Sequence, residues 1–113
     1  MMKLQTEQFF RCLADPLRLN IVLMLMHDGE LCSCELAKAL NEKLSTVSRN
    51  LALLRTKGVV TERREELWLH YQISQSLPSW AKQVLQTVFE GNAQRAVQLC
   101  LDTRVVNSRQ SCL

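Results

Sequence analysis

The sequence predicts a mainly α-helical domain that carries one small β-hairpin, in the order helix, helix, helix, helix, strand, strand, helix. Apolar residues recur at helical spacing through most of the chain, which predicts the helices. Between residues 59 and 73, β-branched and aromatic residues replace that pattern, which predicts the hairpin. The length of 113 residues fits one domain, which we assign to residues 1–103. We expect residues 104–113 to form a flexible tail.

The first two helices meet at an Asp-Pro step. An apolar stripe predicts the first helix at residues 4–14. Asp15 is a favoured N-cap and Pro16 is favoured at the first helical position, so the second helix begins there. Its apolar surface is so broad that we expect this helix to lie at the centre of the fold. Gly29 is expected to end it in a left-handed conformation.

The next two helices, at residues 31–40 and 45–57, are separated by a short polar turn. A pair of helices with so short a connection, the second of them basic, fits a helix-turn-helix. Residues 43–64 contain six basic side chains and one acidic one, whereas residues 1–42 contain four basic and six acidic ones. A basic segment beside an acidic one is the charge distribution expected of a phosphate-binding surface.

The last part of the chain combines the hairpin with a long helix. Strands at residues 59–61 and 68–73 enclose a charged tip at residues 62–66. A final helix is predicted at residues 79–101, with an interruption at residues 90–92 that bends or frays it.

Composition excludes several classes of protein. Five cysteines are an odd number, which argues against a disulfide framework and favours metal binding or burial. No apolar run approaches the roughly 18 residues of a membrane span, and a signal peptide is not recognisable, so we expect a cytoplasmic protein without membrane contact. Two histidines and no recognisable pairing of nucleophile and base argue against an enzyme.

Four local motifs in this order resemble the ArsR/SmtB family of metal-sensing repressors. They are LADPLR at residues 13–18, ELCSCEL at 30–36, STVSRNLALLR at 45–55 and WLHYQI at 68–73. The resemblance covers roughly residues 5–100 and is greatest to the arsenic-responsive branch. It implies a winged helix-turn-helix repressor that binds double-stranded operator DNA as a homodimer and dissociates when a metal or metalloid binds.

In a helix-turn-helix the second helix enters the major groove, where its first residues meet base edges. Arginine can bind guanine through two hydrogen bonds, and serine or threonine can contact a base or a phosphate. The candidate DNA-binding residues are Ser45, Thr46, Ser48, Arg49, Asn50 and Arg55, with Arg63 and Arg64 on the β-hairpin, which we call the wing. Two alternatives stay open: Ser45 and Ser48 cap the helix, or the wing arginines pair with neighbouring glutamates.

The resemblance also implies that the first and last helices build a two-fold dimer, which would match an imperfect palindrome in the operator. The candidate interface residues are Phe9, Phe10, Trp80, Val84 and Val88. The alternative is that these side chains fill the core of the monomer.

Cys32 and Cys34 are the candidate ligands of the inducer. We place them at the start of a helix, where the dipole and unpaired N–H groups stabilise the thiolate. Residues two apart on a regular helix point about 200° apart, so both sulfurs reach one ion only if the first turn unwinds. Such unwinding would couple ion binding to the DNA-reading helix that follows.

Soft thiolates select As(III), Sb(III), Cd(II), Pb(II) or Zn(II). The family's arsenic motif often has a further cysteine where this chain has Ala37, which leaves a third ligand open among Cys12, Cys100, Cys112 and a solvent molecule or small thiol. The favoured interpretation of Cys100 is burial in the core. The favoured interpretation of Cys112 is a tail residue without a function. Residues 79–102 contain no histidine, which argues against the family's zinc site there.

The inducer we predict is As(III) or Sb(III), with Cd(II) or Pb(II) as the alternative and no organic cofactor. Two other functions stay open: a redox-responsive repressor of the same fold, and a small thiol redox or metal-transfer protein. The basic segment at residues 43–64 argues against the transfer protein, which has no use for a phosphate-binding helix.

Overall fold

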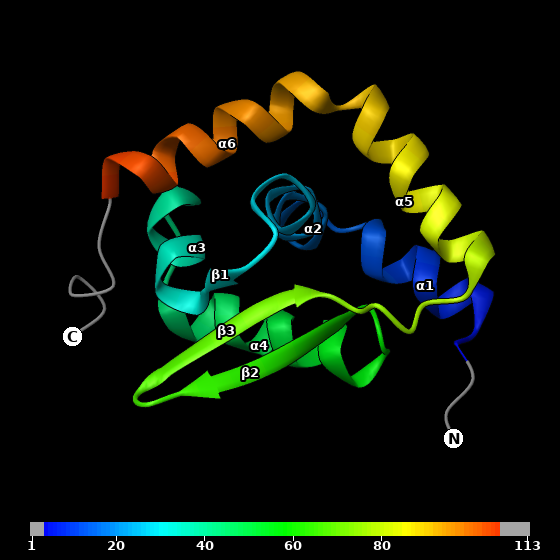
Figure 1. Ribbon diagram of the computed structural model, residues 1–113, viewed down its shortest axis with the longest axis horizontal. Helices are drawn as coiled ribbons and strands as arrows, with labels where there is room; N and C mark the ends of the chain where they lie inside the picture. Colours follow the sequence, from blue (N-terminus) through cyan, green and yellow to red (C-terminus); the bar gives the residue numbers. More distant parts are fainter. Residues whose placement is uncertain (1–3, 107–113) are drawn as a thin grey trace.

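The computed structural model describes residues 4–106, which form six helices and a three-stranded sheet. In chain order the elements are α1 (Thr6–Leu13), α2 (Pro16–Asp28), β1 (Leu31–Cys32), α3 (Ser33–Ala39), α4 (Leu44–Thr56), β2 (Val60–Glu65), β3 (Trp68–Ile73), α5 (Ser79–Gly91) and α6 (Ala93–Val106). Figure 1 shows α2 in the middle, with the other helices and the sheet arranged around it.

The central position of α2 confirms the expectation from its broad apolar surface. Five consecutive side chains, from Ile21 to Leu25, are at most 1% exposed, so water is excluded from all sides of this part of the helix. The predicted ends are also confirmed. Asp15 caps the helix by accepting a 3.1 Å hydrogen bond from the Arg18 backbone N–H, and Gly29 ends it with a φ of +88°.

The sheet has the strand order β1-β3-β2 and is antiparallel throughout. The hairpin of β2 and β3 was expected, but its predicted tip at residues 62–66 is wrong, because residues 62–65 continue β2 and pair with β3. The turn places Glu66 at a φ of +56° with the exposed Leu67 beside it. The strand β1 was not expected, because the apolar pattern predicts a helix that begins at residue 31. Leu31 pairs with Tyr71 and Cys32 with His70, so contact with β3 draws these two residues out of the helix.

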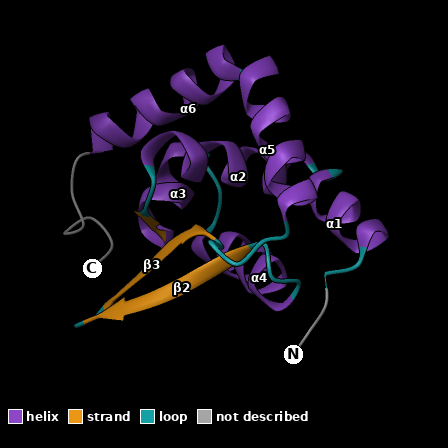
Figure 2. Ribbon diagram, turned by 45° about the vertical axis from the view of Figure 1, so that its right-hand side comes forward, coloured by secondary structure: helices purple, strands orange, loops and turns teal. Residues whose placement is uncertain are grey.

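The last helix is divided into α5 and α6, which meet at an angle (Figure 2). Asn92 lies between them, and its side chain donates a 2.8 Å hydrogen bond to the Val88 carbonyl oxygen. The interruption that was predicted at residues 90–92 is therefore confirmed. Because α6 continues to Val106, residues 104–106 of the predicted tail are helical, and residues 107–113, with Cys112, lie outside the described residues.

None of the helices described for residues 4–106 is long and apolar enough to cross a membrane.

The N-cap of α2 gives a first testable prediction. Replacing Asp15→Ala should lower the free energy of unfolding by about 1 kcal/mol, because the Arg18 N–H loses its acceptor. Urea denaturation measures the change. Asp15→Asn is the matched control, since asparagine caps about as well as aspartate. Equal losses in the two variants would contradict the cap as the cause.

Candidate DNA interface and cysteine site

The helix α4 shows one buried and one exposed face. Val47, Leu51 and Leu54 are fully buried, and they fix the helix on the core. The exposed face carries Ser45, Ser48 and Arg49, and Thr46 is half-buried. Since α4 begins at Leu44 with Lys43 as its N-cap, neither serine occupies the capping position, and the capping alternative is wrong.

Asn50 holds α4 in place through its side chain. Its amide oxygen accepts a 3.1 Å hydrogen bond from Nη1 of Arg18, and its amide nitrogen donates to the Thr46 carbonyl at 2.9 Å. Arg18 also donates to the carbonyl oxygens of Cys12 and Arg11, at 3.0 and 3.1 Å. Asn50 therefore positions α4 against α2 and the end of α1, with both ends of its amide engaged inside the protein.

Arg55 connects α4 to the hairpin. Its Nη1 lies 2.7 Å from Oε1 of Glu62 on β2, and the other oxygen of Glu62 accepts a 2.9 Å hydrogen bond from the Tyr71 hydroxyl on β3. Burial, together with the hydrogen bond to the Glu62 carboxylate, raises the pKa of Tyr71 to about 12. Glu62 thus joins the end of the helix to both strands of the wing.

The two wing arginines differ in their surroundings. Arg63 binds Glu30 with a fork of two hydrogen bonds, of 3.1 and 2.7 Å, and lies 3.5 Å from Glu65. The predicted pairing with a neighbouring glutamate is present, but the shorter contacts go to Glu30, which local sequence could not identify across 33 residues. Arg64 and Arg49 are exposed, and neither has an ion pair among residues 4–106.

Cys32 lies in β1 and at the N-cap of α3, with 1% of its surface exposed. Its backbone N–H donates a 2.8 Å hydrogen bond to Oε1 of Glu35, and its sulfur receives the Glu35 backbone N–H in return. Burial raises the pKa of the Cys32 thiol, and it outweighs the backbone N–H groups of Glu35 and Cys34, which lower it. The backbone N–H groups therefore stabilise the thiolate as expected, but burial destabilises it more. The expectation that the start of the helix favours the thiolate of Cys32 is wrong.

Cys34 is half-buried in the first turn of α3. It is disulfide-bonded, so its sulfur can bind an ion only after reduction. Because Cys32 has an extended backbone before the helix, the two cysteines do not share a regular helix, and the argument from 200° separation does not apply. The Cys32 side chain is almost completely covered, so an ion reaches its sulfur only after the surrounding structure moves.

The other candidate ligands lie on different elements. Cys12 in α1 is 3% exposed and Cys100 in α6 is 1% exposed, so both are core residues, as the favoured interpretation predicted for Cys100. Burial raises the pKa of Cys12. Cys112 lies outside the described residues.

The candidate dimer residues separate into two groups. Phe9 has no exposed surface and packs edge-on against Phe10 and Trp80, with ring centroids 5.5 and 5.3 Å apart. Phe9 is therefore part of the monomer core, which corrects its assignment to an interface. Phe10 and Trp80 are 47% and 36% exposed, and Val84 and Val88 on α5 are half-buried. These four form a partly exposed apolar surface across α1 and α5.

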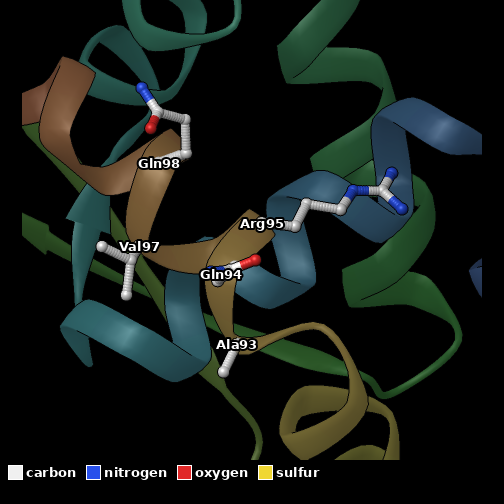
Figure 3. Close-up of a pocket in the computed structure, with 5 residues that line it drawn as sticks. All are labelled: Ala93, Gln94, Arg95, Val97 and Gln98. Atoms are coloured by element: carbon white, nitrogen blue, oxygen red, sulfur yellow. The ribbon is translucent and has the colours of Figure 1, made fainter.

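A shallow hollow lies on α6 (Figure 3). The residues that line it come from this helix alone: Ala93, Gln94, Arg95, Val97 and Gln98. Arg95 points away from the others toward α2, where its Nε donates to the Asn20 side chain at 2.8 Å. No second element closes the hollow, and we assign it no ligand.

Comparisons with known proteins agree with this geometry. The family described as "Bacterial regulatory protein, arsR family" matches residues 15–62. The arsenical resistance operon repressor of Escherichia coli K12 is 36% identical over 105 residues, which are 93% of this chain and 86% of that protein. The arsenic resistance transcriptional regulator ArsR2 of Pseudomonas putida KT2440 is 40% identical, over 75% of this chain and 74% of that protein.

Among solved structures, the homodimeric winged helix-turn-helix domain of Mb0332 from Mycobacterium bovis is similar, with a TM-score of 0.64 and 27% identity. The similarity covers 79% of each chain. This likeness confirms the winged helix-turn-helix fold.

The environment of Cys32 predicts slow alkylation. In the reduced, folded protein, iodoacetamide should modify Cys32 more slowly than in urea, because the thiol is covered and protonated. Its pKa lies above the ordinary 9.0, so the folded-state rate should still rise with pH where an exposed thiol has levelled off. The folded state disfavours the thiolate, so this group's contribution to stability is complete below pH 9.0 and is lost as pH rises through the folded pKa.

Peptide mass spectrometry after timed alkylation measures these rates. The half-buried Cys34, in the same reduced samples, is the internal comparison. Equal rates for Cys32 in folded and unfolded protein at neutral pH would contradict the burial argument.

Proposed function

Since the chain belongs to the arsR family of bacterial regulatory proteins, we propose that it is a repressor whose dimer releases operator DNA when As(III) or Sb(III) binds Cys32 and Cys34. Proteins of this family bind DNA and regulate transcription, and they are not enzymes, in agreement with the sequence analysis. The observation that carries the proposal is the position of Cys32: it pairs with the wing strand β3 and caps the first helix of the helix-turn-helix.

The exposed face of α4 supports DNA reading by Ser45, Ser48 and Arg49, with Thr46 at its edge. In the proposed complex this face enters the major groove, and Arg49 donates two hydrogen bonds to a guanine. Arg64 contacts phosphate, which positions the wing. The ion pairs of Arg55 and Arg63 support a different role for these two residues, which is to hold the wing against α4 and the Cys32 segment.

The apolar surface of Phe10, Trp80, Val84 and Val88 supports a dimer built from α1 and α5. The relative Mb0332 is itself homodimeric. Two copies related by a two-fold axis would read an imperfect palindrome, with one half-site for each α4. We place this complex in the cytoplasm, where the operator is accessible.

Thiol chemistry supports the choice of inducer. As(III) binds thiolates, so capture by Cys32 and Cys34 requires both sulfurs in the reduced form. Each As–S bond that forms replaces one As–O bond of arsenite, and the hydroxide that leaves takes up the thiol proton and departs as water. In this proposal, movement of the Cys32 sulfur to the ion separates β1 from β3. The separation also disturbs the residues next to Glu30, whose carboxylate accepts two hydrogen bonds from Arg63. Because the ion favours this opened state and DNA favours the closed one, binding of either weakens binding of the other.

The sequence preference of α4 is testable with one arginine. Arg49→Ala should reduce the preference for an operator, selected from random duplexes, over unrelated DNA by about 1–3 kcal/mol. Arg64→Ala should instead weaken binding to all sequences and reduce the salt slope by about 1. Fluorescence anisotropy at several salt concentrations measures both. Arg95→Ala, on α6, is the control, and an Arg49 variant that keeps its preference would rule out base reading.

The inducer site is testable by release of DNA. Arsenite added to the reduced complex should raise the Kd for operator by roughly 5–150-fold, the usual range of allosteric coupling. The Cys32→Ser, Cys34→Ser variant should bind operator as the parent does and ignore arsenite. A response that survives in this variant would disprove the assignment of the two cysteines.

Parallel titrations with Sb(III), Cd(II), Pb(II) and Zn(II) rank the inducers. Release by Cd(II) or Pb(II) in preference to As(III) would support the alternative inducer. Release by an oxidant without any metal would support a redox-responsive repressor, for which the disulfide state of Cys34 is the favouring observation.

A further inference from the structure

Three metal-binding side chains from two elements meet where α6 packs against the end of α2. His27 and Asp28 are the last residues of α2, and Cys100 lies on α6. One ligand atom from each residue, a ring nitrogen, a carboxylate oxygen and a sulfur, lies within 4.8 Å of the other two. The two helices are in contact, and Cys100 Sγ lies 3.7 Å from the Met24 carbonyl oxygen one turn before the end of α2.

The geometry of these atoms is close to that of a bound metal ion. Bonds of about 2.0 Å to nitrogen or oxygen and 2.3 Å to sulfur place tetrahedral ligand atoms roughly 3–4 Å apart. The ring nitrogen Nδ1 of His27 lies 2.8 Å from Oδ1 of Asp28, so these two atoms would separate slightly and the sulfur would approach. The widest separation of the three atoms, at most 4.8 Å, therefore exceeds the required one by about 1 Å.

The electrostatic surroundings favour a cation. The site is at the C-terminal end of a 13-residue helix, where the macrodipole places partial negative charge. Asp28 adds a carboxylate. The side chains of His27 and Asp28 are 23% and 21% exposed, whereas Cys100 is 1% exposed, so an ion would enter from solvent past two ligands and meet a covered third.

We propose that His27, Asp28 and Cys100 bind one Zn(II) ion per chain, with water as the fourth ligand. Nitrogen, oxygen and a single sulfur are ligands that Zn(II) accepts together, whereas As(III) requires several thiolates. Binding replaces the proton of the Cys100 thiol with the metal, and the proton goes to solvent. This site is separate from Cys32 and Cys34. In this proposal Cys100 binds Zn(II) and is not the third ligand of As(III) or Sb(III).

The bound ion would connect α2 to α6 by direct bonds. Because α6 also packs against α3, the connection would restrain the helix that contains Cys34. Zn(II) would therefore stabilise the closed arrangement of the fold, since it binds the folded chain and leaves the unfolded chain without a preformed site.

Titration with Co(II), an optical substitute for Zn(II), tests the site. The full chain with Cys32→Ser and Cys34→Ser is the background, which removes the other cysteine site. We expect one equivalent of Co(II) to bind with a thiolate-to-cobalt charge-transfer band, and Zn(II) to displace it. Adding Cys100→Ser should abolish the band, whereas Cys12→Ser, which alters a buried cysteine on α1, should keep it. A background protein without the band, or a Cys100→Ser protein that keeps it, would overturn the proposal.

His27→Gln provides a second test at a partly exposed position, where the fold tolerates substitution better than at Cys100. Loss of this ligand should weaken Co(II) binding by more than the roughly tenfold that loss of an outer-shell partner costs. Zn(II) should raise the Tm of the background protein and leave that of the His27→Gln variant unchanged. Equal shifts in both proteins would again overturn the site. With native Cys32 and Cys34, His27→Gln should still release DNA with arsenite, so the two proposals fail independently.

Discussion

Exclusion of water from α2 is the constraint on which the arrangement of the other elements depends. Side chains from Ile21 to Leu25 point in all directions around the helix, and all are buried. Each fully buried aliphatic side chain contributes about 1.5–3 kcal/mol, and that contribution is obtained only if neighbours cover every side. The remaining helices and the sheet provide this cover, and in doing so they leave α4 with one face on the core and one face toward solvent.

Within this frame, a few charged contacts fix the surfaces that we propose to meet DNA. Arg18 joins α2 to Asn50 of α4, and Glu62 joins α4 to both strands of the wing. Glu30, two residues before Cys32, accepts two hydrogen bonds from Arg63 and so connects that segment to the wing. These groups are partly exposed, so each contact adds little to stability. Their effect is on geometry, because together they give α4, the wing and the Cys32 segment a common position.

The chemistry that an inducer needs at Cys32 is opposed by the fold. A metalloid binds thiolate, whereas burial of the Cys32 side chain favours the protonated thiol. In the folded arrangement the Cys32 thiol is therefore a poor ligand, and in the proposed mechanism the ion is captured when this arrangement opens. This opposition is the physical basis of the proposed response, since a ligand shifts an equilibrium only by its difference in affinity for the two states.

Features of this protein that follow local rules can be predicted from its residues alone. The Asp15-Pro16 start of α2, the apolar face of α4, the hairpin and the interruption near Asn92 follow from capping, periodicity and β-propensity. Tertiary structure decided what depends on distant partners. The strand β1 exists because β3 pairs with it, Phe9 is core because α5 covers it, and Glu30 binds Arg63 across 33 residues. A strand of two residues and an ion pair between distant residues leave no periodic pattern in the sequence. Only the folded chain shows which residues meet.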